Sequence, residues 1–248
     1  MEENLTPEIE KAYLELSHGH GDHLYTGCSR QIYNNKVPGG IQVIGYGQTA
    51  QALKQFFDDA RLWPVPFSGL QGLSADIIQL NGGESVYNKD YTIRTHRNFH
   101  PSVGMGGSIG FRFDIAKSKT KNVSIAYTTD LEFDFKPGMQ VQENAAQLKK
   151  DYQAFISGAD VLLVDTEHTK EEYFESKSYV RGWGHPYLEQ IIDLAGEAGV
   201  KHIIGTHHNK DHTDDILRKI EQQGKEYAKA QGFTGELNLA RSGMRITL

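Results

Sequence analysis

Hydrophobic positions along the chain recur with two different periods, and these periods predict both strands and helices. Short apolar runs and alternating segments indicate strands, whereas apolar residues three or four positions apart indicate helices. The expected strands cover residues 41–44, 75–80, 91–95, 108–115, 123–127, 159–164, 202–205, 237–239 and 244–248. The expected helices cover residues 48–60, 144–156, 187–198 and 214–230. Because the two kinds of element alternate without repeats or a linker, we expect an α/β fold made of one domain, residues 1–248.

Turn-forming residues punctuate these elements. The triplet Asn81-Gly82-Gly83 separates two expected strands, and Pro186 and Gly199 bracket the helix expected at 187–198. Proline suits the first turn of a helix because its φ is fixed, and glycine suits the position just past the end. The chain has 248 residues, which is long enough to bury a substantial core.

The richest candidate chemistry lies in a histidine-rich run, Ser17-His18-Gly19-His20-Gly21-Asp22-His23. It follows an apolar segment, residues 13–16, that suits the end of a strand. Alternating residues of an extended chain share one face, so we expect His18, His20 and Asp22 to converge while His23 turns away. Imidazole and carboxylate groups bind zinc and similar divalent metals, and manganese and iron also accept them. The run therefore predicts a metal site, with zinc as the default ion and room for two ions side by side.

Composition narrows the class of protein. The 32 acidic residues outnumber the 26 basic ones, which gives a net charge of −6, so no basic surface for nucleic acid is evident. No apolar stretch approaches the roughly 18 residues of a membrane span, and the polar, acidic start does not resemble a secretory signal. The single cysteine, Cys28, cannot form an internal disulfide and suits a buried thiol better than a metal ligand. We therefore expect a cytoplasmic protein without a membrane partner.

Three further candidate ligands follow expected strands. His100 comes after the strand at 91–95, Asp130 after the strand at 123–127, and His207 after the strand at 202–205. Taken singly, His100 could be a loop residue, Asp130 a turn cap and His207 a surface histidine. Side chains just past buried strands are where an α/β fold gathers its chemistry, so together with the histidine-rich run they predict one site.

These motifs resemble those of the metallo-β-lactamase-fold hydrolases, in particular the phosphodiesterase branch that includes ribonuclease Z. The resemblance covers nearly everything from residue 14 onward. It rests on residues 16–23, 98–101, 106–112, 126–130, 159–165, 184–186, 198–201, 206–208 and 240–248. The family implies an αββα sandwich of mixed sheets flanked by helices.

The resemblance also implies a dinuclear metal site. The two ions would have separate histidine ligands and one shared carboxylate: His18, His20 and His100 for one ion, Asp22, His23 and His207 for the other, and Asp130 for both. A hydroxide held by the ions would be the nucleophile, because metal coordination lowers the pKa of water. The expected catalytic residues are Asp22, through the ion that it binds, and His185, which would stabilise the transition state or protonate the leaving group. A capping or packing role for His185 is the alternative.

Neighbouring residues leave some assignments open. One of His207 and His208 is the expected ligand, and the alignment at the strand end favours His207. Asp165 is expected to hold a ligand histidine from behind. His168 suits either the rim of the pocket or a solvated loop.

The sequence departs from the family pattern in three places. Only 17 residues precede His18, whereas the family places further strands there. The fold is therefore expected to be short at its N-terminus, to borrow strands from a partner, or to begin at a chain start that is not the ancestral one. Pro186-Tyr187 follows His185 where the family often has Ser-Thr, and Asn209-Lys210 stands where related chains often carry Asp-Pro. Because missing strands would leave a sheet edge open to pairing, we expect a homodimer.

The expected activity is hydrolysis of a phosphodiester, small or cyclic, by a metal-bound hydroxide. The acidic net charge disfavours transfer RNA, which would call for a basic clamp. The turn Gly106-Gly107-Ser108 could present backbone N–H groups to phosphate. Two other classes stay open: a metal-binding sensor or redox module that does not hydrolyse, and a degenerate scaffold of the same fold.

Overall fold

The computed structural model describes residues 12–24, 41–47, 49–59, 61, 65–69, 73–87, 90–101, 107–116, 122–134, 144–175 and 180–248. The chain divides into two compact units. The first comprises residues 1–82 and 103–106, and the second comprises residues 83–102 and 107–248. Cys28 and Gly106 lie outside the described residues.

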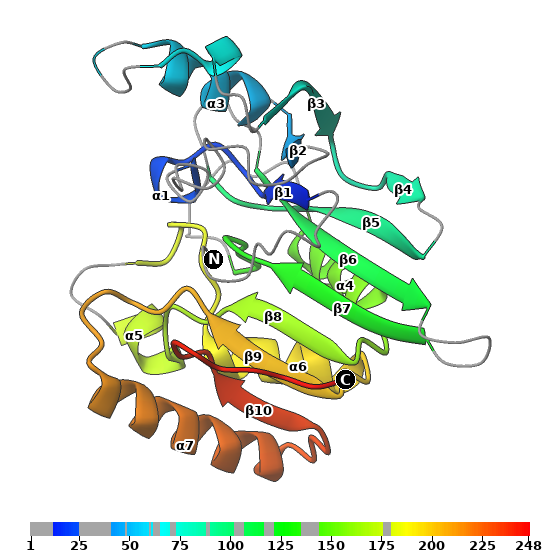
Figure 1. Ribbon diagram of the computed structural model, residues 1–248. Coiled ribbons are helices and arrows are strands. Elements are labelled where there is room, and N and C mark those ends of the chain that lie inside the picture. Colours follow the sequence, from blue (N-terminus) through cyan, green and yellow to red (C-terminus); the bar gives the residue numbers. More distant parts are fainter. Residues whose placement is uncertain are drawn as a thin grey trace. The chain divides into compact units, whose positions relative to one another are not determined.

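The first unit is built on a sheet of three parallel strands in the order β1-β2-β3 (Figure 1). Its core follows from the apolar spacing of one helix, on which Leu53 and Phe57 lie four residues apart and are fully buried. They pack with Leu16 and Val43, which come from two of the strands. The elements of this unit are β1 (Ala12–Leu16), α1 (Gly21–Leu24), β2 (Ile41–Tyr46), α3 (Thr49–Asp58), η3 (Phe67–Gly69) and β3 (Leu73–Leu80).

The second unit contains a seven-stranded mixed sheet in the order β10-β9-β8-β7-β6-β5-β4. Its first four strands in the chain form an antiparallel meander: β4 (Ser85–Tyr87), β5 (Tyr91–Asn98), β6 (Ser108–Ala116) and β7 (Asn122–Thr128). The other three run parallel to β7: β8 (Val161–Asp165), β9 (His202–Thr206) and β10 (Glu236–Leu239). Because β5 is two antiparallel steps from β7, it points in the same direction as β7, β8 and β9.

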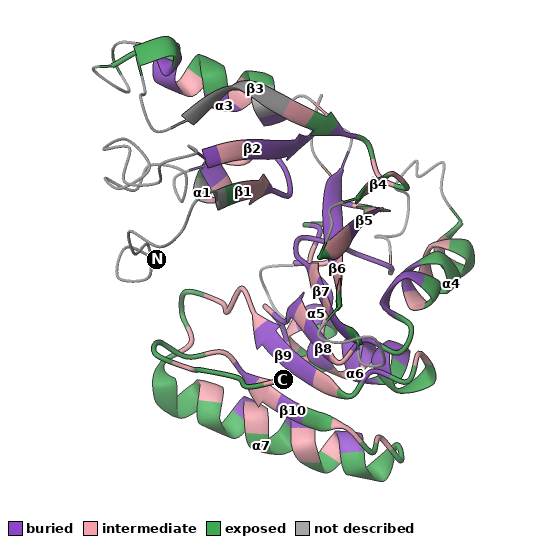
Figure 2. Ribbon diagram, turned by 45° about the vertical axis from the view of Figure 1, so that its right-hand side comes forward, coloured by how far each residue is buried: buried purple, intermediate pink, exposed green. Residues whose placement is uncertain are grey.

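Helical crossovers connect the parallel strands. They contain α4 (Ala145–Ile156), α5 (Lys170–Glu175), α6 (Leu188–Glu197) and α7 (Asp214–Ala230). Each crossover moves one strand along the sheet in the same direction, and right-handed crossovers of that kind place their helices on one face. Consistently, Tyr152 of α4 and Ile191 of α6 share a buried core with Leu162 and Ile203 of the sheet. Figure 2 shows the burial that follows from this packing: the residues of β9 are mainly buried, whereas α7 is exposed along most of its length.

The structure confirms the predicted α/β class and most predicted elements, and it corrects some boundaries. The strand expected at 244–248 is wrong: the chain turns at Gly243, with φ of 78°, and residues 244–248 have no strand pairing and are largely exposed. Their alternating pattern therefore has no buried face to cover. Pro186 precedes α6 instead of entering its first turn, because Tyr187 is the extended N-cap residue. The single-domain assignment stays a prediction.

Four short elements escaped the sequence patterns. They are α1, η3, β4 and α5, each of six residues or fewer, which is too short to display a hydrophobic period. Among the described residues, no helix is both long and apolar enough to cross a bilayer.

His96 gives the second unit a testable pH dependence. Its ring stacks on Phe155 with centroids 5.1 Å apart, and burial, opposed by the charge of Asp151, lowers its pKa from the ordinary 6.5 to about 4. Because the unfolded chain takes up this proton first, His96 stabilises the fold above about pH 6.5 and this contribution is lost as the pH falls toward about 4. The substitution His96→Phe keeps the stacking and removes the titration.

We therefore expect the urea midpoint to fall less between about pH 7 and about pH 5 in His96→Phe than in the unaltered protein. Between about pH 7 and about pH 8, the urea midpoints of the two proteins should change by the same amount, because His96 titrates below this range in both the folded and the unfolded chain. Equal losses of stability on acidification would contradict the assignment.

Candidate metal centre

The candidate site of the second unit lies where its strands end. Strands β5, β7, β8 and β9 point the same way, so their carboxyl ends meet at one edge of the sheet. His100 follows β5, Asp130 follows β7, Asp165 ends β8 and His207 follows β9. His185 joins them because the crossover from β8 to α6 begins at the same edge. The topology therefore gathers five polar residues that are distant in sequence.

Asp130 is central to this group, because its two carboxylate oxygens face two different imidazoles. Oδ2 lies 3.8 Å from Nε2 of His100, and Oδ1 lies 3.7 Å from Nε2 of His207. Asp130 is 2% exposed. Burying a carboxylate is unfavourable unless positive charge or hydrogen bonds compensate it. The Thr129 hydroxyl donates to Oδ1 at 2.5 Å, and a cation between the carboxylate and the imidazoles would add the positive charge.

Two of these residues have strained backbones. Asp130 has φ of 49° and His207 has φ of 55°, and among the described residues they are the two non-glycine residues with positive φ. The left-handed conformation costs a non-glycine residue about 1–2 kcal/mol, and such strain concentrates at functional sites. The Ser108 hydroxyl helps to hold Asp130 in this conformation by donating to its carbonyl oxygen at 2.8 Å.

The carboxylate of Asp165 supports the site from behind through His185, and the expectation that it holds a ligand histidine stays a prediction. The carboxylate is fully buried and accepts hydrogen bonds from the backbone N–H of Asp130 at 3.2 Å and of Glu167 at 2.9 Å. Nδ1 of His185 lies 2.6 Å from its Oδ2, and since a carboxylate can only accept, Nδ1 carries the proton. Nε2 of His185 is thereby the nitrogen left for other chemistry.

His185 and His207 form a stacked pair, with ring centroids 4.9 Å apart and planes inclined by 14°. Burial lowers the pKa of each imidazole, but the facing carboxylates of Asp165, Glu167 and Asp130 outweigh it and raise both pKa values to about 9. The same carboxylates that attract these protons also attract a divalent cation, which competes with protons for imidazole nitrogen.

A second buried carboxylate, Glu132, holds the loop that carries His185. Its Oε1 accepts from the backbone N–H of Gly182 at 2.7 Å and its Oε2 from that of Gly184 at 3.0 Å, and the Tyr173 hydroxyl also donates to it. Gly184 in turn fixes His100, whose Nδ1 donates to the Gly184 carbonyl oxygen at 3.1 Å. This leaves Nε2 of His100 directed at Asp130.

The histidine-rich run of the first unit brings its own imidazoles close together. Nδ1 of His18 lies 3.1 Å from the Ser17 hydroxyl, and Nε2 of His18 lies 2.8 Å from Nδ1 of His20. The extended backbone ends at His20, because its carbonyl oxygen accepts from the N–H groups of both His23 and Leu24 and so starts α1. His23 therefore does not turn away as expected, and its ring centroid lies 4.2 Å from that of His18. Asp22 lies in α1, and its side chain is outside the described part of the chain.

The residues present fit a divalent metal. Two ligands at about 2.0–2.1 Å from a tetrahedral ion lie about 3.3–3.4 Å apart. The separations of 3.7 and 3.8 Å around Asp130 are slightly wider than this and too long for hydrogen bonds. One set of ligand atoms within 4.8 Å of one another comprises Asp130, Asp165, His185 and His207.

The structure also describes three residues whose roles the sequence left open: His208, His168 and Ser108. Nε2 of His208 lies 3.0 Å from the Ala240 carbonyl oxygen, so His207 is the member of the pair that faces Asp130. His168 is 2% exposed, so the solvated-loop interpretation is wrong, and its ring centroid lies 6.2 Å from that of His185. The Ser108 hydroxyl is turned to the Asp130 carbonyl, and the role of the glycine turn in phosphate binding stays a prediction.

Two carboxylates of the site, Glu132 and Glu167, were not predicted from the sequence. Oε2 of Glu167 lies 3.3 Å from Nδ1 of His185 and 3.4 Å from Nδ1 of His207. A signal was available, since each glutamate lies two residues after an aspartate at the end of a parallel strand, in Asp130-Leu131-Glu132 and Asp165-Thr166-Glu167.

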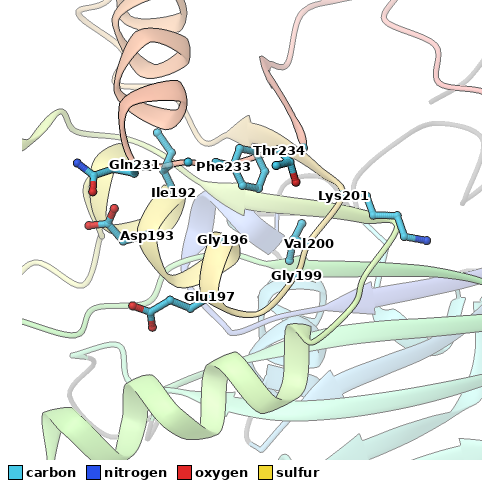
Figure 3. Close-up of a pocket in the computed structure, with 12 residues that line it drawn as sticks. Ile192, Asp193, Gly196, Glu197, Gly199, Val200, Lys201, Gln231, Phe233 and Thr234 are labelled. Atoms are coloured by element: carbon cyan, nitrogen blue, oxygen red, sulfur yellow. The ribbon is translucent and has the colours of Figure 1, made fainter.

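A hollow of about 630 Å³ lies elsewhere, at the opposite end of β9 from His207 (Figure 3). Asp193 and Glu197 of α6 line it together with Phe233 and Gly235, which follow α7. It contains none of the residues that gather at the carboxyl ends of β5, β7, β8 and β9.

Comparison with known proteins agrees with the fold. The family model described as "Beta-lactamase superfamily domain" matches residues 12–208. The chain therefore belongs to the β-lactamase superfamily, and it is a ribonuclease Z-like member of the metallo-β-lactamase fold, as the motifs predicted. The class of protein that this family and fold define is the metal-dependent hydrolases.

Individual relatives are distant. Ribonuclease Z of Streptomyces coelicolor is 23% identical over 93% of this chain and 78% of its own length. Among solved structures, the metallo-β-lactamase fold protein YhfI from Bacillus subtilis has a TM-score of 0.60 at 18% identity, over 94% of this chain and 76% of that one. The short form of human tRNase Z has a TM-score of 0.59 at 16% identity, over 97% and 80%.

The contact between Gly184 and His100 gives a prediction about metal affinity. A Cβ atom at Gly184 would fall 2.0 Å from Nδ1 of His100, and φ there is +98°. Gly184→Ala should therefore displace the imidazole and weaken zinc binding by about 10–100-fold, the effect typical of disturbing groups that orient a ligand. Competition with a chromogenic zinc chelator measures the affinity.

Gly199→Ala is the matched control, because Gly199 also has positive φ, +70°, but a Cβ atom added there would meet open space. Both variants should lose about 1–2 kcal/mol of stability to backbone strain, and only Gly184→Ala should lose zinc affinity. Equal affinities in the two variants would show that His100 does not depend on Gly184.

Proposed function

We propose that this protein is a two-metal phosphodiesterase that hydrolyses a small or cyclic phosphodiester. The observation that carries the proposal is the two-sided Asp130 carboxylate, with one oxygen 3.8 Å from His100 and the other 3.7 Å from His207. A carboxylate placed between two imidazoles in this way suits a ligand shared by two ions. The Thr129 hydroxyl also donates to Oδ1 at 2.5 Å, whereas the separations from the two imidazoles are too long for hydrogen bonds.

The proposed ligand sets follow the resemblance to the family. They are His18, His20 and His100 for one ion, Asp22, His23 and His207 for the other, and Asp130 for both. When bound, the two ions supply Lewis-acid stabilisation of a phosphoryl oxygen and lower the pKa of a water molecule to near neutrality. Zinc is the proposed metal, with manganese and iron as alternatives.

The chain's own residues orient these ligands. Gly184 accepts the Nδ1 proton of His100, which presents Nε2 as the ligand atom. Asp165 accepts the Nδ1 proton of His185, and Nε2 of His185 then donates to a phosphoryl oxygen or to the leaving group. Proton donation of this kind typically contributes about 10²–10⁴-fold to the rate.

The substrate class rests on less specific support. The net charge of −6 opposes tight electrostatic binding of a long nucleic acid, which favours a small phosphodiester. The names of two relatives, ribonuclease Z and tRNase Z, favour RNA as the second candidate. A cytoplasmic location and a homodimer are further proposals carried from the sequence.

Reconstitution tests the activity directly. Chelator-stripped protein is refilled separately with zinc, manganese or iron and assayed with bis(p-nitrophenyl) phosphate. We expect turnover to return with one metal and to be lost in Asp22→Ala. Two tightly bound ions without turnover of this ester, or of a precursor transfer RNA, would refute the phosphodiesterase and favour the sensor, redox or scaffold alternatives.

Paired substitutions test the separate roles of Asp130 and His185. Asp130→Ala removes the shared ligand, so both metal content and rate should fall, the zinc affinity by more than about 100-fold. His185→Ala should lower the rate by about 10²–10⁴-fold with metal content unchanged. Metal is counted by mass spectrometry after gel filtration, alongside steady-state kinetics.

Asp160→Ala is the control for loss of a carboxylate. Asp160 lies just before β8, at the opposite edge of the sheet, where its Oδ1 accepts from Lys201 at 2.7 Å, so this variant should keep both metal and rate. Release of metal by His185→Ala would make His185 a ligand and would overturn its assigned role.

A further inference from the structure

Trp183 is an exposed aromatic residue next to the candidate site. It is 57% exposed, whereas a tryptophan is usually largely buried. The next residue, Gly184, contacts His100, and the one after is His185. Since consecutive Cα atoms lie about 3.8 Å apart, the backbone of Trp183 is within about 8 Å of that of His185. Large exposed aromatic side chains beside a site commonly serve binding.

The backbone on both sides of Trp183 is fixed. The buried Glu132 carboxylate holds the N–H groups of Gly182 and Gly184, the residues that flank Trp183, and the N–H of Trp183 donates to the Val180 carbonyl oxygen at 3.0 Å. Gly182 and Gly184 have φ of 91° and 98°, a conformation that suits glycine. The indole is thus displayed on a turn that needs little ordering when a ligand binds.

The remaining side chains of this loop already have structural partners. Arg181 lies over the ring of Phe174 at 5.5 Å, and its Nε donates to the Asp134 carbonyl oxygen at 3.2 Å. Within the described part of the chain, no comparable side-chain contact is seen for the indole of Trp183. A flat π surface beside a phosphate-hydrolysing centre matches a substrate with a flat ring attached near its phosphate, as in a nucleotide.

We propose that Trp183 is a specificity-determining residue that stacks on a nucleobase of the substrate. The proposal rests on the proposed phosphodiesterase function and narrows its substrate to a phosphodiester that carries a base. Stacking of one base on an aromatic side chain typically strengthens binding by about 5–150-fold, and it tolerates every base, because each has a π face. A membrane lipid or a sugar phosphate without a base would gain nothing from this residue.

A binding experiment tests the stacking without relying on turnover. Metal-loaded protein is titrated by calorimetry with adenosine 5′-monophosphate and with ribose 5-phosphate, which share the phosphate and sugar and differ in the base. We expect the nucleotide to bind at least about 10-fold more tightly. This preference should persist in Trp183→Phe and disappear in Trp183→Leu.

Tyr87→Leu is the matched control, since Tyr87 is 79% exposed on β4, whose last residue pairs near the start of β5, at the edge of the sheet away from His100. This variant should keep the preference for the nucleotide. Equal binding of the two ligands by the unaltered protein, no binding of either, or an unchanged preference in Trp183→Leu would each overturn the proposal. A loss of dimer in Trp183→Leu with the preference intact would assign Trp183 to a subunit contact instead.

Hydrolysis separates this inference from the proposed function. Thymidine 5′-(p-nitrophenyl phosphate) and methyl p-nitrophenyl phosphate share a leaving group, and only the first carries a base. In Trp183→Leu, kcat/KM for the thymidine ester should fall about 10-fold more than for the methyl ester, mainly through KM. If both esters are hydrolysed and the two losses are equal, the stacking is refuted and the phosphodiesterase stands. If neither ester is hydrolysed while the Trp183-dependent preference for the nucleotide persists, base stacking stands and the phosphodiesterase is refuted.

Discussion

The position of the Asp130 carboxylate is the constraint on which the site of the second unit depends. Its two oxygens face imidazoles from β5 and β9, so an error in its placement would disturb both sides of the site at once. The left-handed backbone that aims it is unfavourable by about 1–2 kcal/mol. Two neighbours offset this: Asp165 accepts the N–H of Asp130, and Ser108 donates to its carbonyl oxygen. The strain persists because buried, specific hydrogen bonds determine the conformation.

Asp165 and Glu167 add negative charge near the Asp130 carboxylate, and this charge makes the site suitable for a cation. Asp165 and Asp130 are almost completely buried, and Glu167 lies within 3.4 Å of both His185 and His207. The carboxylates raise the pKa values of His185 and His207 by more than burial lowers them. Without a metal, protons on these imidazoles therefore compensate the negative charge. A divalent cation meets the same need with more charge and a defined geometry. The site is thus electrostatically suited to a metal, beyond having the correct ligand types.

The sequence predicted the parts of the site that local patterns encode. Apolar strands ending just before Asp130 and His207 were visible as periodicity, and the parallel topology then brings these ends together. The histidine-rich run was also visible, but the prediction that His23 turns away assumed an extended chain. The backbone bends at His20 because two N–H groups share one carbonyl oxygen. Glu132 was missed although it lies two residues after Asp130, because its hydrogen-bond partners, the backbone N–H groups of Gly182 and Gly184, are about 50 residues away in the sequence.

The turn held by Glu132, Gly182-Trp183-Gly184-His185, has three roles that the sequence alone does not reveal. The Gly184 carbonyl orients His100, the next residue, His185, donates to Asp165, and Trp183, between the two glycines, is exposed to solvent. The orienting contacts of Gly182 and Gly184 with Glu132 use backbone atoms, so they do not depend on the side chain at position 183. That position can therefore vary in evolution, and change which substrates are preferred, without displacing the imidazoles that the turn holds. A rigid turn built from backbone contacts is in this sense a place where specificity and catalysis are separable.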